Sequence, residues 1–88
     1  MAVRSVANDL DVTRVAVSAS KRVGNAVVRN RVRRRIKEAF RCLPVSEGFD
    51  VVIVPRPEAA QAGFAALQSE LTLLLKRARL LVEEGPKE

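Results

Sequence analysis

The sequence predicts a small α+β domain in which two strands, a helix, a third strand and a second helix follow one another. Three observations support this β-β-α-β-α sandwich. Residues 12–20 alternate between two kinds of side chain, as a strand with one buried face does. Apolar residues recur every four positions from Val28 to Phe40, and a leucine-rich segment follows Phe64. Both patterns are typical of helices that pack on one face.

Length and composition limit the architecture to one domain. The 88 residues suffice for a single small core. The sequence has no apolar run long enough to span a membrane and no signal-peptide pattern at its start. Its single cysteine, Cys42, has no partner for an internal disulfide, which suits a reducing cytoplasm. We therefore expect one cytoplasmic domain over residues 1–88 with no membrane partner, in which residues 83–88 fray.

The first two predicted strands surround a turn. Residues 2–7 form the first strand, residues 8–11 are rich in turn formers, and residues 12–20 form the second strand. This order predicts an antiparallel hairpin. One face of the second strand is small and polar, with Arg14, Ala16 and Ser18. That face is either the floor of an exposed groove or simply the wetted side of the sheet, and the residues alone favour the wetted side.

A helix is expected from Val27 to about Arg41, and it dominates the charge of the protein. Residues 21–41 hold nine of the sixteen basic residues but one of the ten acidic ones. Like charges stand four residues apart, as in Arg29 and Arg33, and each such pair costs roughly a few tenths of a kcal/mol in an isolated helix. Because several such repulsive pairs occur in one helix, we expect a polyanionic partner that neutralises them, and nucleic acid is the usual one.

The second half of the chain continues with a strand and a helix. Pro44 ends the basic helix, because proline cannot continue it. Phe49–Val54 is an almost continuous apolar run, which predicts a strand covered on both faces. Residues 58–62 are either a loop or a single helical turn. The last helix runs from Phe64 to about Leu81, and basic residues near its end suit the negative end of the helix dipole.

The residue inventory argues against a catalytic role for the polypeptide itself. It contains no His and no Tyr, so neither a Ser-His nor a Cys-His pair is possible. Asp9 and Asp11 are the one close acidic pair in the first half, and they lie in the predicted turn, where Asp is common. We therefore predict no catalytic residues and leave metal positions open. The inventory indicates a binding subunit.

One long motif carries a family resemblance. It reads Lys21-x-x-Gly24-x-Ala26-Val27-x-Arg29-Asn30-Arg31-x-Arg33-Arg34 and is followed by Lys37-Glu38-Ala39-Phe40-Arg41. This pattern resembles the RNR signature of the bacterial ribonuclease P protein family, and the resemblance extends from about residue 2 to residue 81. It implies a ribosomal protein S5 domain 2-like fold with a left-handed βαβ crossover, which no periodicity predicts.

The resemblance also implies a function. In ribonuclease P, an endonuclease of tRNA processing, the RNA subunit holds the catalytic Mg²⁺ ions and removes the 5′ leader of precursor tRNA. The protein binds that RNA and the leader, and it takes no small-molecule substrate. Residues of the signature and of the segment just before the helix are then expected to contact the ribonuclease P RNA. They are Lys21, Arg22, Arg29, Asn30, Arg31, Arg33, Arg34 and Lys37. The strand that carries Arg14, Ala16 and Ser18 is expected to form part of the leader groove.

The sequence departs from the family pattern at its beginning. Ahead of the region that this sequence matches, the family carries a helix whose basic and aromatic residues line the leader groove. Phe40, Phe49 and Phe64 lie at positions expected to be buried, so none is an obvious stacking platform for bases. We therefore expect contact with the RNA subunit and an incomplete leader groove. Two other interpretations stay open, namely a general RNA-binding, ribosome-associated module and a stand-alone nuclease.

Overall fold

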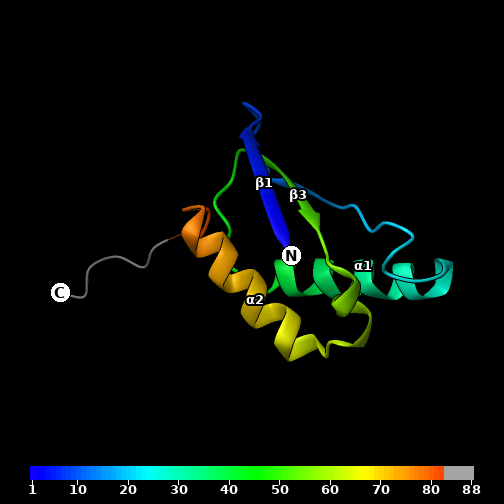
Figure 1. Ribbon diagram of the computed structural model, residues 1–88. Coiled ribbons are helices and arrows are strands. Elements are labelled where there is room, and N and C mark those ends of the chain that lie inside the picture. The colour runs from blue at the N-terminus through cyan, green and yellow to red at the C-terminus, as the bar shows by residue number, and fades with distance from the viewer. Residues whose placement is uncertain (83–88) are drawn as a thin grey trace.

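The computed structural model describes residues 1–82, and its elements follow the predicted order (Figure 1). The strands are β1 (Ala2–Ala7), β2 (Arg14–Val17) and β3 (Phe49–Val54). The helices are α1 (Ala26–Arg41), the short 3-10 helix η1 (Pro57–Gln61) and α2 (Phe64–Arg77). Of the two alternatives for residues 58–62, the helical turn is thus the one observed. The predicted fraying of residues 83–88 lies outside the described part of the chain.

The three strands form one sheet with the order β1-β3-β2. The central strand, β3, pairs antiparallel with β1 and parallel with β2. The predicted hairpin is therefore wrong, because β3 lies between the two strands that we expected to pair. The apolar run of β3 occupies the centre of the sheet, where both of its edges are hydrogen-bonded. Residues 8–13 carry the chain past the start of β3, and the backbone N–H of Asn8 donates to the carbonyl of Gly48 there (2.9 Å).

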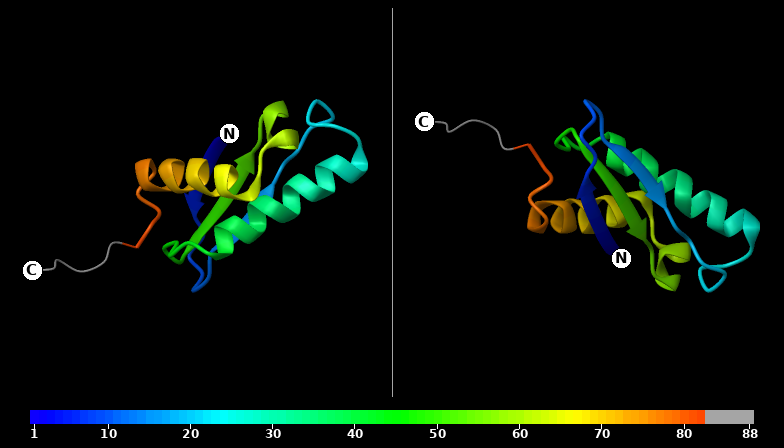
Figure 2. Two further views of the ribbon diagram at one scale, coloured as in Figure 1. Left: turned by 90° about the horizontal axis from the view of Figure 1, so that it is seen from below. Right: turned by 90° about the horizontal axis from the view of Figure 1, so that it is seen from above.

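The connection from β2 through α1 to β3 joins two parallel neighbours and is left-handed (Figure 2). In the left view of that figure the helices lie in front of the sheet and both strands point upward. The chain moves leftward there, from β2 to β3. Most crossovers of this kind are right-handed. The resemblance, rather than the residue pattern, predicted the observed hand, and that prediction is confirmed.

Both long helices cover the same face of the sheet (Figure 2). This face contributes Val51 and Ile53 of β3, which are 1% and 0% exposed. The helices contribute most of the other fully buried side chains of the core, including Val32, Ile36, Ala39, Leu71 and Leu75. On the opposite face, Val52 and Val54 are each 39% exposed. The prediction that β3 is covered on both faces is therefore wrong, because helices lie on one side of the sheet alone within the described residues.

A tight turn sets the start of α1. Gly24 has a φ of +153°, and a Cβ there would lie 2.7 Å from Cγ1 of Val28, so a larger residue would displace the first turn of the helix. Asn25 is the N-cap, and its Oδ1 accepts a hydrogen bond from the backbone N–H of Val28 (3.0 Å). The helix begins at Ala26, one residue before the predicted start. Among residues 1–82, no helix combines the length and apolarity that crossing a membrane requires.

Candidate nucleic-acid interface

Helix α1 presents basic side chains on both sides of its buried stripe. At 100° per residue, Arg29, Arg33 and Lys37 share one side, which we call the 29-33-37 flank. These side chains are half-buried along their stems. Within residues 1–82, no carboxylate lies within ion-pair distance of any of the three. Arg33 Nη1 donates to Oδ1 of Asn30 (2.9 Å), which positions that guanidinium without neutralising it. The charge of this flank is therefore available to a partner.

The opposite side of the stripe, which we call the 31-35 flank, faces η1. Nη2 of Arg31 donates to the backbone carbonyl of Ala60 (3.5 Å), and Nη1 of Arg35 donates to that of Ala62 (3.2 Å). These bonds tie α1 to the segment that follows β3. Arg31 was predicted to contact RNA, and no local pattern reveals its bond to η1, because the carbonyls that accept from Arg31 and Arg35 are 29 and 27 residues away along the chain. Each guanidinium has five N–H donors, so both arginines keep donors for a second partner.

Two buried donors on α1 have no partner among the described residues. They are the Nε atoms of Arg29 and Arg31. An unpaired buried donor is costly, and more so when it belongs to a charged group. Nε and a terminal nitrogen of one guanidinium can donate in parallel to two oxygens of a phosphate, which is the bidentate geometry. Both Nε atoms have almost no solvent-accessible surface in this structure, so pairing either of them with a phosphate requires its arginine side chain to shift.

The remaining predicted RNA contacts lie close to the same surface. Lys21 and Arg22 are exposed in the turn before α1, where the N–H of Gly24 donates to the carbonyl of Lys21 (3.2 Å). Backbone N–H groups at a helix start favour anions. Asn30 and Arg34 are exposed on the side of α1 that faces away from the core. The structure thus places all eight predicted residues on one helix and the turn that leads into it.

The predicted leader-groove residues lie on the open face of the sheet. Arg14 and Ala16 alternate with half-buried Val15 and buried Val17 of β2, and Ser18 follows the strand. The guanidinium of Arg14 is already paired, since its Nε and Nη2 donate to the two carboxylate oxygens of Asp50 (2.8 Å each). Together with a hydrogen bond from Nδ2 of Asn8 (2.9 Å), this fork lowers the pKa of Asp50 to about 2.

The open face is more apolar than the sequence analysis expected. In one row across the sheet, Arg4 of β1, Val52 of β3 and Ala16 of β2 stand side by side. Val6 and Val54 are exposed nearby, and shallow hollows run on either side of β3. Arg4, Val52 and Val54 were missed because the predicted hairpin left β3 out of this face. The open face thus combines exposed apolar side chains with shallow hollows beside β3.

Comparison with known proteins decides the family. Residues 1–79 match the family model described as Ribonuclease P. The chain belongs to this family. The ribonuclease P protein component of Clostridium novyi is 43% identical over 75 residues, which cover 83% of this chain and 66% of the relative. That of Dehalococcoides mccartyi is 34% identical over 84 residues, or 96% of this chain and 70% of the relative. The chain thus spans about two thirds of the length of these curated relatives.

Solved structures of ribonuclease P proteins share the fold. The Staphylococcus aureus protein superposes with a TM-score of 0.79 at 30% identity, covering 91% of this chain and 75% of that one. The Thermotoga maritima protein gives a TM-score of 0.77 at 28% identity, with 93% and 76% covered. The predicted α+β fold of the ribonuclease P protein family is therefore confirmed.

The neighbouring carboxylates Asp9 and Asp11 of this ribonuclease P family member were predicted to be turn residues. Asp9 and Asp11 lie in the turn between β1 and β2, where Asp9 has a φ of 61°, a conformation that Asp tolerates in turns. Within residues 1–82, no three side chains of the His, Cys, Asp and Glu types come together in a way that would hold a metal ion. The described part of the chain therefore offers no cage for a catalytic metal.

Proposed function

We propose that this chain is the protein subunit of ribonuclease P and that it binds the catalytic RNA through α1. The 29-33-37 flank carries the proposal, because three cations stand about one helical turn, or roughly 6 Å, apart without a carboxylate of the described residues beside them. Exposed Arg34 extends this positive surface around the helix. Phosphates of a folded RNA would relieve the repulsion along the flank and fork onto the guanidinium groups.

The same proposal assigns the 5′ leader of precursor tRNA to the open face of the sheet. Arg4 and Arg14 stand on its two edge strands, with Val52 of β3 opposite Arg4 and Asp50 of β3 opposite Arg14. A single strand binds such a surface with its phosphates near the cations and its bases over the flat floor. Because Asp50 compensates the charge of Arg14, we expect the open face to bind RNA more weakly than α1 does.

We assign the chemistry, and the Mg²⁺ ions that it requires, to the RNA subunit. The described residues offer no metal cage, whereas Mg²⁺ is readily held by phosphate oxygens and water. In this proposal the holoenzyme is the endonuclease of tRNA 5′ maturation in the cytoplasm. The protein contributes affinity for RNA and a surface that orients the leader.

Reconstituted cleavage of precursor tRNA tests the proposal. At low Mg²⁺, addition of this chain to ribonuclease P RNA is expected to restore leader removal. Arg33→Ala is expected to require about tenfold more protein, the cost of roughly one charge-assisted hydrogen bond. Arg77→Ala, which removes an exposed arginine from the end of α2, is the matched control and is expected to behave as wild type.

Other outcomes would point to other functions. A general RNA-binding module would bind unrelated folded RNA as tightly as ribonuclease P RNA and leave cleavage unchanged. Cleavage by rigorously RNA-free protein would indicate a stand-alone nuclease. Either result would contradict the proposal.

A further inference from the structure

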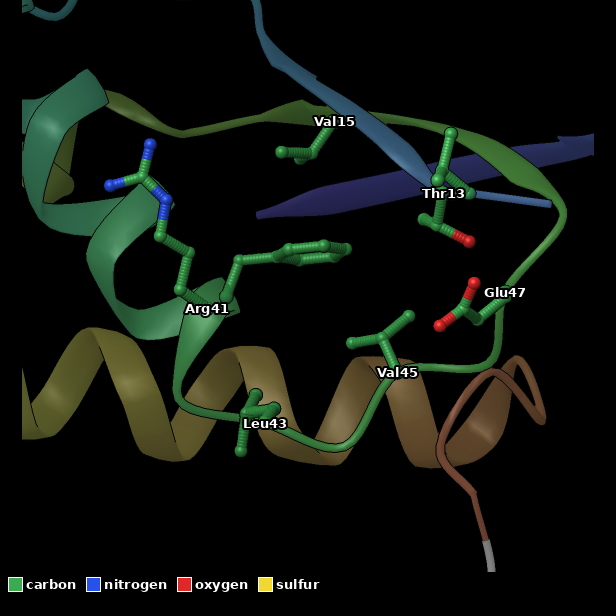
Figure 3. A pocket seen from close by; sticks show the side chains of 8 residues that line it. Thr13, Val15, Arg41, Leu43, Val45 and Glu47 are labelled. Carbon is green, nitrogen blue, oxygen red and sulfur yellow. The ribbon is translucent and has the colours of Figure 1, made fainter. Parts of the chain in front are cut away.

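A pocket of about 350 Å³ opens beside the last turn of α1, and the proposed function leaves it without a role. It lies between β2, the end of α1 and the segment that leads to β3 (Figure 3). Eight residues line it: Val12, Thr13, Val15, Phe40, Arg41, Leu43, Val45 and Glu47. It opens at the edge of the sheet and is therefore distinct from the hollows of the open sheet face.

The pocket has an apolar floor and opposite charges on two sides. In Figure 3 the side chains of Val15 and Val45 point into the space, the guanidinium of Arg41 lies on one side, and the carboxylate of Glu47 lies on the other. Arg41 makes a long contact of 3.7 Å with Glu38, which leaves most of its donors unused. Within residues 1–82, Glu47 takes part in no ion pair. A ligand with a flat apolar body and polar edges would match these walls.

The pocket continues the cationic line of α1. Positions 29, 33, 37 and 41 succeed one another at four-residue spacing, so the side chain after Lys37 in this series is Arg41 at the rim. An RNA strand whose phosphates follow the 29-33-37 flank therefore arrives at the pocket. Unpaired RNA bases are commonly splayed out, stacked on aromatic rings or guanidinium planes, and hydrogen-bonded at their edges.

We propose that this pocket receives an unpaired base of the RNA that lies along α1, an inference that rests on the proposed function. The base lies against Val15, Val45 and the ring of Phe40, with Arg41 at the rim. The carboxylate of Glu47 accepts a hydrogen bond from the Watson–Crick edge of the base. Because a carboxylate is an acceptor only, the pocket favours bases with an exocyclic amino group, namely cytosine, adenine and guanine. Uracil has one Watson–Crick donor, N3–H, which lies between two carbonyl oxygens that repel the carboxylate, so uracil is disfavoured.

A strand from a second copy of this chain is the competing occupant, because β2 is an edge strand. The charge of the molecule favours the RNA base. Each copy carries a formal net charge of +6, and the cations of α1 lead to the pocket, so two copies that meet along β2 repel each other. The same charges attract an RNA strand.

Binding of uniform eight-nucleotide RNAs tests the base pocket. Wild-type protein is expected to bind oligocytidine about tenfold more tightly than oligouridine, as one hydrogen bond to a charged acceptor gives. Glu47→Gln is expected to reduce that ratio to about one, because an amide both donates and accepts. Glu58→Gln, at an exposed acidic residue of η1, is the matched control and is expected to keep the wild-type ratio.

Methyl NMR locates the base directly. On addition of oligocytidine, the methyl signals of Val15, Leu43 and Val45 are expected to shift through the ring current of an inserted base. Unshifted methyl signals, or a Glu47→Gln variant that keeps the tenfold ratio, would overturn the base pocket. So would shifts of the same signals that depend on protein concentration without RNA, since these indicate a second copy along β2.

The two proposals fail in different ways. If Arg33→Ala weakens binding of every RNA while the pocket variants match wild type, the base pocket is wrong and the proposed function stands. If Arg33→Ala leaves the affinity for ribonuclease P RNA unchanged, the proposed function is wrong, and the base pocket falls with it.

Discussion

The two flanks of α1 carry the same kinds of side chain and differ in what surrounds them. On the 31-35 flank, backbone carbonyls of the η1 segment accept hydrogen bonds from both arginines. On the 29-33-37 flank, the recorded side-chain bond joins Arg33 to Asn30 of the same helix. The helical period thus divides one arginine-rich motif into a part that hydrogen-bonds to the rest of the fold and a part that we propose binds RNA. A count of charges along the sequence does not show this division.

The largest expected effect lies between the flanks, on the buried stripe of α1. Ile36 is 0% exposed, so Ile36→Ala is expected to lower the free energy of unfolding by about 2–5 kcal/mol through lost burial and a cavity. Denaturant titration measures this loss. Under conditions where the variant is folded, its affinity for RNA is expected to stay near wild type. An unchanged unfolding free energy would show that the stripe and the flanks are wrongly assigned.

A large effect on binding is expected from the 29-33-37 flank. Arg33→Ala is expected to weaken binding of ribonuclease P RNA about tenfold, because a charge-assisted contact with phosphate is lost. Its free energy of unfolding is expected to stay within about 0.5 kcal/mol of wild type, as for most surface substitutions. Fluorescence anisotropy with labelled RNA and a denaturant titration give the two numbers. A variant that loses stability and keeps affinity would reverse the proposed roles of the flanks.

On the 31-35 flank, a substitution is expected to reduce stability more than it reduces RNA affinity, and both changes are expected to be small. Arg35→Ala removes the bond to the carbonyl of Ala62, which is expected to cost about 1 kcal/mol of unfolding free energy. Its RNA affinity is expected to fall less than that of Arg33→Ala. If the two variants lose RNA affinity equally and Arg35→Ala unfolds like wild type, the distinction between the flanks disappears.

The smallest expected effect concerns the open sheet face and acid. Arg14 and Asn8 lower the pKa of Asp50 from 3.8 to about 2 in the folded protein. The unfolded chain therefore takes up this proton first as pH falls, so the pair stabilises the fold above about pH 4 and loses that contribution between pH 4 and pH 2. The effect is expected to be small because the pair is exposed to solvent.

Asp50→Asn tests that contribution. Its denaturation midpoint, followed from pH 6 to pH 2, is expected to decline less steeply than that of wild type below pH 4. Parallel curves for the two proteins would show that the Arg14–Asp50 pair does not contribute to stability.

Local sequence patterns predicted α1 well, whereas the order of the strands in the sheet depends on contacts between residues that are distant in sequence. The four-residue recurrence from Val28 to Phe40 and the density of arginine depend on neighbours in sequence, and both survive in the structure. The predicted hairpin failed because strand order depends on which strand pairs with β3 across the sheet. The exposure of one face of β3 was not predicted, because its apolar residues run continuously. A valine at an exposed position cannot be distinguished from a buried one by residue type.

Two polar contacts escaped the sequence analysis for the same reason. The partners of Arg31 and Arg14 lie 29 and 36 residues away, and no spacing rule connects such distant positions. Arg31 was therefore predicted as an RNA contact alone, and Arg14 was predicted as part of the leader groove without its partner Asp50. The resemblance to the family supplied the hand of the crossover, which the residues alone did not give.

The salt dependence of affinity for ribonuclease P RNA tests the central claim most directly. Each phosphate contact contributes roughly 0.7–0.9 to the slope of log affinity against log salt concentration. Replacing Arg29, Arg33 and Lys37 together by Ala is expected to lower the magnitude of that slope by about two. Replacing Arg31 and Arg35 is expected to lower it by less than about one. Equal changes in both variants, or no change in either, would contradict the account.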